Sequence, residues 1–123
     1  MTGKIVTVDF VAKEPASNEW KMVLVENGPW EGAIEDHLRA LQTRLYDCID
    51  AALDGEFAER FPESKGRPLI IQVDCYNLPR DTVEPFFDKF STGVFTAGGY
   101  VDAIAQNSYV SGIGFVITFD SIH

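Results

Sequence analysis

The sequence has few basic side chains. Its 123 residues include 10 lysines and arginines against 19 aspartates and glutamates, so its formal net charge is −9 with histidine neutral. A nucleic-acid-binding domain needs clustered lysine and arginine to neutralise phosphates, and the sequence contains no such cluster. The composition therefore excludes a nucleic acid partner. It favours a basic protein partner, whose approach an acidic chain would attract and steer.

Long apolar runs are also absent. No run approaches the ~20 residues that are needed to cross a bilayer, so we expect no membrane partner. The first residues, MTGKIVTVD, lack the charged segment and apolar stretch of a secretory signal, and they resemble a first strand instead. These two features predict a cytoplasmic protein.

Cysteine and histidine are scarce. Cys48 and Cys75 lie in apolar helix and strand patterns without Cys-x-x-Cys or zinc spacing, which favours two buried free thiols over a disulfide. His37 precedes Cys48 by eleven residues, about 16 Å along an ideal helix, so the two side chains cannot form a catalytic dyad. Glycine-rich phosphate-binding motifs are missing too. We therefore predict no catalytic residues, no metal, no cofactor and no enzymatic activity.

The apolar patterns that are present predict a single α+β domain over residues 1–123. Strands are predicted over residues 4–12, 20–26, 69–76 and 113–119, and the first two are expected to form an antiparallel hairpin with Val8 and Phe10 on its buried side. Helices are predicted from about residue 31 to Gly55 and from about residue 81 to Gly98-Gly99. Residues 100–110 fit either a short helix or an irregular strand.

The β-β-α-β-α-β order predicts how these elements pack. We expect a mixed, mostly antiparallel four-stranded sheet with both helices on one face. The nearly continuous apolar character of residues 113–119 favours a central strand.

The end of the first predicted helix is rich in carboxylates. Acidic side chains at a helix C-terminus oppose the helix dipole by roughly several tenths of a kcal/mol each, and such local conflicts tend to mark functional surfaces. A solvated helix face is the alternative interpretation. We predict a partner-binding surface here, with Tyr46 and Phe57 as apolar anchors if they are exposed. Its acidic members are Asp47, Asp50, Asp54, Glu56 and Glu59.

Two further places are candidate sites. Gly28-Pro29 ends the second strand, and Trp30 is expected to pack over the first turn of the next helix near Ile34. Trp30 and His37 together form a candidate corner for a small ligand. The second place is the polar side of the strand over residues 69–76, which carries Gln72, Asp74 and Tyr76.

Several of these segments resemble a known family. The Gly28-Pro29-Trp30 corner, the helix with His37-Leu38 and the PESKGRP run before the third strand are similar to a family of small uncharacterised bacterial proteins, over about residues 20–76. This resemblance implies a fold and no catalytic residue.

A weaker similarity concerns the class of protein. Small, acidic, single-domain proteins without catalytic residues resemble immunity proteins of contact-dependent growth inhibition systems, which bind a toxin domain and block its active site. The leading hypothesis is therefore a non-enzymatic cytosolic immunity protein that neutralises a cationic toxin domain. A self-associating module, which would be a homo-oligomer, and a small-ligand binder at the Trp30–His37 corner are the alternatives.

Overall fold

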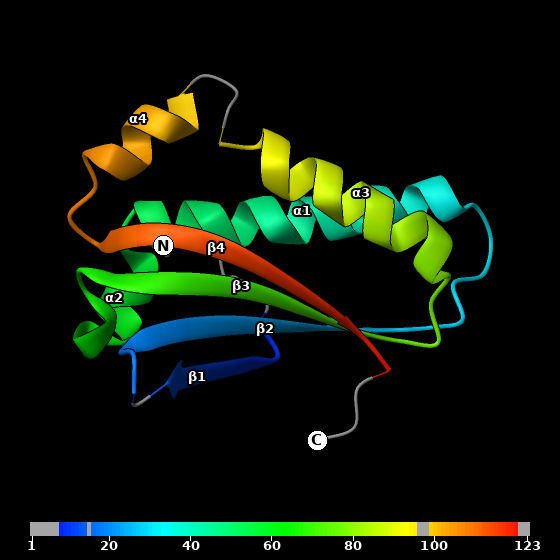
Figure 1. The fold of residues 1–123 in the computed structure, drawn as a ribbon, viewed down its shortest axis with the longest axis horizontal. Coiled ribbons are helices and arrows are strands. Elements are labelled where there is room, and N and C mark those ends of the chain that lie inside the picture. Colours follow the sequence, from blue (N-terminus) through cyan, green and yellow to red (C-terminus); the bar gives the residue numbers. More distant parts are fainter. Residues whose placement is uncertain (1–7, 15, 96–98, 121–123) are drawn as a thin grey trace, which may run out of the picture.

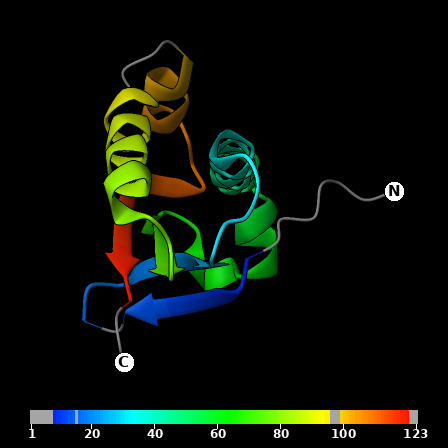
Figure 2. The ribbon, with the colours of Figure 1, turned by 90° about the vertical axis from the view of Figure 1, so that its right-hand side faces the viewer.

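The computed structural model describes residues 8–14, 16–95 and 99–120. One sheet contains β1 (Phe10–Glu14), β2 (Glu19–Asn27), β3 (Arg67–Tyr76) and β4 (Val110–Phe119), in the order β1-β2-β3-β4. Two long helices, α1 (Ile34–Leu53) and α3 (Arg80–Gly93), lie over the same face of this sheet (Figures 1 and 2). The predicted α+β class, the four-stranded mixed sheet and the β-β-α-β-α-β order are confirmed.

Short helices complete the chain. They are α2 (Glu56–Arg60), the 3₁₀ turn η1 (Pro62–Ser64) and α4 (Gly99–Ala105). The helix α4 decides the open question of residues 100–110 in favour of a short helix followed by β4. The second long helix ends earlier than predicted, at Gly93. Gly98 lies outside the described residues.

The strand directions differ from the prediction. β1 and β2 are antiparallel, as expected for a hairpin, but β2 runs parallel to β3 and β3 runs parallel to β4. The expectation of a mostly antiparallel sheet is therefore wrong. Each parallel pair is joined through a long helix, which returns the chain to the end of the sheet where the previous strand began.

The last strand is at an edge of the sheet, so the prediction of a central strand is also wrong. Its apolar sequence has a different cause. Ile113, Phe115 and Ile117 alternate toward the helices and pack on the core. The positions between them carry Gly114 and Val116 rather than polar residues, which gives the strand its continuous apolar appearance.

The first strand places Phe10 outside. Val8 packs on the core as predicted, but Phe10 is 61% exposed and Val11 takes the inner position. The backbone bends at Asp9, and this bend shifts the alternation by one residue.

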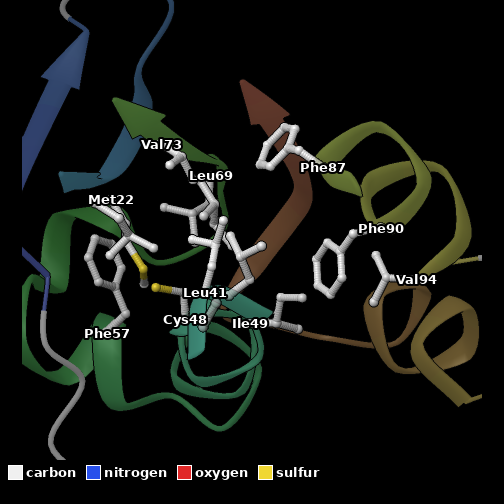
Figure 3. Packing of buried hydrophobic residues seen from close by; sticks show 14 of the residues in the cluster. Met22, Leu41, Cys48, Ile49, Phe57, Leu69, Val73, Phe87, Phe90 and Val94 are labelled. Carbon is white, nitrogen blue, oxygen red and sulfur yellow. The ribbon is translucent and has the colours of Figure 1, made fainter. Parts of the chain in front are cut away.

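The core lies between the sheet and the two long helices (Figure 3). Its central side chains come from β2, β3 and α1, and each typically contributes about 1.5–3 kcal/mol by burial. Among the fully buried ones are Met22, Leu24, Leu41, Leu45, Ile49, Ile71 and Val73. Cys48 and Cys75 are buried within this core as free thiols, which confirms that prediction.

Candidate functional site

The acidic residues predicted to bind a partner lie at the end of α1 and on α2. Asp47, Asp50 and Asp54 are three and four residues apart, so they share one stripe of α1. At about 100° per residue this stripe is opposite the buried stripe of the helix, which includes Leu45 and Ala52.

The other two carboxylates, Glu56 and Glu59, are on α2, which lies beneath the C-terminal end of α1 in the view of Figure 1. Asp54 and Glu59 are exposed, and the other acidic residues of the set are partly exposed. The chain carries no lysine or arginine between Arg44 and Arg60. The five carboxylates (Asp47, Asp50, Asp54, Glu56 and Glu59) are called the acidic surface below.

The apparent conflict with the dipole of α1 has a local explanation. Gly55 adopts a left-handed conformation with φ 92°, and α2 begins directly after it. An oxygen of the Asp54 carboxylate accepts a hydrogen bond of 2.9 Å from the backbone N–H of Glu56. Glu56 and Glu59 lie in the first turn of α2, where negative charge is favourable. Three of the five carboxylates thus stabilise the start of the next helix.

The two predicted aromatic anchors are not equally accessible. Phe57 is only 6% exposed and its ring packs against Trp20 and Phe61, so it does not meet the condition of exposure. Tyr46 is partly buried, with its ring edge against Phe90 at 5.1 Å between centroids. The period of α1 predicted which residues share a stripe. The direction that the chain takes after Gly55, which buries Phe57, was not predictable from that period.

Arg44, the basic residue closest in sequence before the acidic surface, is engaged elsewhere. Its guanidinium pairs with Glu26 and, at 3.1 Å, with Asp9, and the Asp9 carboxylate also accepts a 2.7 Å hydrogen bond from the N–H of Val25. Burial alone would lower the pKa of Arg44, but these hydrogen bonds outweigh it and raise that pKa. Arg44 thereby joins α1 to β2 and to Asp9, which directly precedes β1. Both of these carboxylates lie outside the acidic surface.

The Trp30–His37 corner is a packed joint. The two rings are stacked, with 5.0 Å between centroids and 8° between planes, so Trp30 packs on the His37 ring in the first turn of α1. The Nε2 of His37 donates a 2.6 Å hydrogen bond to the carbonyl of Glu31. Each ring covers one face of the other, and a ligand at this corner is left with their outer faces and edges.

The polar residues of β3 lie on the sheet face opposite the long helices, as predicted. The Asp74 carboxylate is buried and accepts hydrogen bonds from Gln72 (2.8 Å) and from the Thr118 hydroxyl (2.9 Å). Asp74 therefore ties β3 to β4, while Tyr76 is partly exposed beside it.

Both thiols are expected to resist modification in the folded protein. Burial raises the pKa of Cys48 and that of Cys75 from 9.0 to about 12. Neither thiol should react with Ellman's reagent at pH 8, and both should react in urea, because the thiolate is the nucleophile. Fast reaction of either cysteine in the native protein would contradict this burial.

The same pKa shifts predict a loss of stability at high pH. An unfolded thiol ionises near pH 9 and a folded one near pH 12, so the stabilisation is complete below pH 9 and is lost between pH 9 and 12. Between pH 8 and 10 each thiol should remove about 1 kcal/mol from the free energy of unfolding. Urea titrations of the wild type and of a Cys48→Ala variant measure this, and an equal pH slope in both would refute it.

Within the described residues, no group of three or more His, Cys, Asp or Glu side chains is placed to hold a metal ion. None of the helices in the described ranges is long and apolar enough to cross a membrane.

The fold and this surface define a small α+β protein with a four-stranded mixed sheet, two long helices on one face and an acidic helix end. The chain belongs to a family of unknown function (DUF6572), whose model matches residues 3–107. This match includes the region of about residues 20–76 in which the sequence resembled an uncharacterised family, and it also includes β1 and α3. No curated protein and no solved structure matches the chain.

Sequence reasoning missed the role of Arg44. Its position was informative, because it lies three residues after Leu41 and four before Cys48, at the margin of the apolar stripe. A charged side chain there needs a partner. The partners are Asp9, which directly precedes β1, and Glu26 of β2, and their proximity to Arg44 depends on how the hairpin packs on α1.

Proposed function

We propose that the protein is a non-enzymatic binding protein that holds a basic protein partner on its acidic surface. The observation that carries the proposal is the position of five carboxylates on the outer stripe of α1 and on α2, with no basic residue between Arg44 and Arg60. Such a surface attracts a positively charged domain, speeds its approach and sets its orientation.

The more specific form of the proposal is an immunity protein that neutralises a cationic toxin domain in the cytoplasm. It rests on the similarity of class between this chain and such inhibitors, which are small, acidic and without catalytic groups. Binding alone is sufficient for this function, because a toxin is blocked when its active site is covered.

The first test is capture of the partner. The tagged protein is used as bait in a lysate of the cells that produce it, with washes at low and at high salt. A stoichiometric basic protein that is released by high salt is expected, since exposed charge pairs are screened by ions. Recovery of the bait alone, at both salt concentrations, would overturn the proposal.

The second test places the interface. An Asp54→Asn/Glu59→Lys variant raises the net charge by three, and the asparagine oxygen can still accept the hydrogen bond from Glu56. Affinity for the captured partner should fall by about a hundredfold or more at low salt. The matched control, Asp81→Asn/Asp88→Lys on α3, makes the same charge change at two exposed residues. Its affinity for the partner should stay within about threefold of the wild-type affinity. Equal losses in both variants would show that net charge, and not this surface, governs binding.

Self-association is a second candidate, favoured by β4. This strand spans ten residues without a charged side chain, and in the described part of the chain nothing pairs with its outer edge. Natural proteins usually protect such an edge with charges, proline or a bulge. β4 has neither a charged residue nor proline, and its one register irregularity, at Ser111, lies at the start of the strand. Light scattering over a range of protein concentrations tests this candidate. A mass that rises with concentration in the absence of any partner would favour it.

A further inference from the structure

A pocket of about 410 Å³ lies beside the acidic surface, between β1 and α2. Its inner walls are apolar and come from four elements, with Val11, Met22, Ala51, Phe57 and Phe61 among the lining residues. Phe10, also in the lining, is 61% exposed. The volume is in the range of ordinary ligand pockets, and it is ample for one long side chain.

The charged lining residues indicate which ligand the pocket favours. Asp9 and Glu56 bring two carboxylates, and Arg60 brings one cation. Asp9 already pairs with Arg44, whereas the Glu56 carboxylate makes no ion pair within the described residues. Arg60 is exposed, so its charged head can remain in water.

Glu56 belongs both to this pocket and to the acidic surface. A group that enters the pocket from a protein seated on the acidic surface therefore meets apolar walls and a carboxylate at Glu56. A side chain with an aliphatic stem and a cationic end satisfies both. The stem gains by leaving water, and the cation gains an unpaired carboxylate.

We propose that this pocket receives one lysine or arginine side chain of the basic partner, with its aliphatic stem against Phe57 and Phe61 and its cationic head at Glu56. This proposal rests on the proposed function, because it identifies the anchoring residue type of the same partner. Interfaces commonly concentrate their affinity in one such buried anchor.

Small probes test the pocket without the partner. Butylguanidinium and butylammonium reproduce the two side chains, while butanol and butyrate keep the stem with a neutral or a negative end. In ¹H–¹⁵N spectra of the ¹⁵N-labelled protein, the cations should shift the amide signals of Val11, Glu56 and Phe57 in a saturable way. Butanol should bind more weakly and butyrate should not bind. Equal effects of all four probes, or no saturable shift, would overturn the proposal.

Variants identify the carboxylate and the cavity. Glu56→Gln should lower the affinity for butylguanidinium by about threefold or more. Glu59→Gln, on the same helix but outside the pocket lining, should leave this affinity unchanged. Ala51→Leu should block the pocket by adding three carbons to its wall. Phe10→Ala, at an exposed position where folding is not at risk, should also lower the affinity for butylguanidinium. Val116→Ala is the matched control at another exposed position. If the Glu56, Ala51 and Phe10 variants all bind butylguanidinium with the wild-type affinity, the proposed site is refuted.

The pocket and the proposed function can fail separately. If Asp54→Asn/Glu59→Lys abolishes partner binding while Phe10→Ala and Ala51→Leu leave it intact, the acidic surface is the interface and the pocket proposal is wrong. If no basic partner is captured but the cationic probes bind as described, the proposed function fails and the pocket stands as a site for amphipathic cations.

Discussion

Replacement of Gly28 by alanine is expected to lower the free energy of unfolding by more than about 3 kcal/mol, or to prevent folding altogether. A Cβ atom at this position would lie 1.9 Å from the carbonyl oxygen of Asn77 and 2.8 Å from its carbonyl carbon. Both are backbone atoms, so no side-chain rotation relieves the contact. The N–H of Gly28 also donates a 2.7 Å hydrogen bond to Tyr76, which holds the ends of β2 and β3 at this separation.

Two other glycines serve as controls for this experiment. A Cβ at Gly112 in β4, or at Gly93 at the end of α3, meets no atom within 4 Å, and neither residue has a positive φ. Urea unfolding should show Gly112→Ala within about 1 kcal/mol of the wild type, and Gly93→Ala equal to it or up to about 1 kcal/mol more stable. A Gly28→Ala protein with the wild-type unfolding midpoint would contradict the close approach of β2 to the segment after β3.

The Gly28 contact shows where prediction from sequence ends. The Gly28-Pro29 pair correctly predicted the end of the second strand, because both residues are typical of turns. The specific need for glycine arises from Asn77, which is 49 residues further along the chain. That proximity follows from the parallel pairing of β2 with β3. The helix between these strands is typical of parallel pairing, but the sequence does not specify which residues of the two strands meet.

The helices were predicted better than the sheet, because a helix follows from the pattern within one segment. The buried side of α1 follows from a period of 3.6 residues within one segment, and the structure places Leu41, Leu45 and Ile49 in the core as expected. The sheet depends on contacts between distant segments. Phe10 was predicted to be inside, but a bend at Asp9 moved it to the surface, and the position of β4 at the edge was not encoded in its composition.

The candidate site was predicted in part. The carboxylates of the acidic surface are visible in the sequence, and the helical period correctly placed Asp47, Asp50 and Asp54 on one stripe. The pocket was not predictable, because β1, β2, α1 and α2 each supply part of its wall. Phe57 belongs to that wall. Its exposure was left open as a condition of its role as an anchor, because nothing in the sequence specifies how the chain turns at Gly55.

Gly55 is the second position at which a methyl group should have a large effect. Gly55→Ala is expected to cost about 2–4 kcal/mol of the free energy of unfolding, since two independent penalties add. The residue has φ 92°, which an L side chain rarely adopts, and a Cβ would lie 2.7 Å from the ring of Tyr109. Gly66→Ala is the matched control. Gly66 has φ 78° but open space where a Cβ would lie. The free energy of unfolding of this variant should therefore fall only by the cost of the left-handed backbone conformation, about 1–2 kcal/mol.

The steric cost of Gly55→Ala can be measured separately, because the clashing atoms belong to the side chain of Tyr109 and can be removed by mutation. In a Tyr109→Ala background, Gly55→Ala should cost no more than Gly66→Ala does, and a double-mutant cycle should give a coupling of about 1 kcal/mol or more between positions 55 and 109. Equal costs of Gly55→Ala with and without the Tyr109 ring would refute the contact.

Gly55 also affects the acidic surface, because it lies between Asp54 and Glu56. Its left-handed conformation sets the position of the carboxylates of α2 relative to those of α1. A stable Gly55→Ala/Tyr109→Ala protein that binds the basic partner less tightly would therefore show that the acidic surface acts through its geometry as well as through its charge.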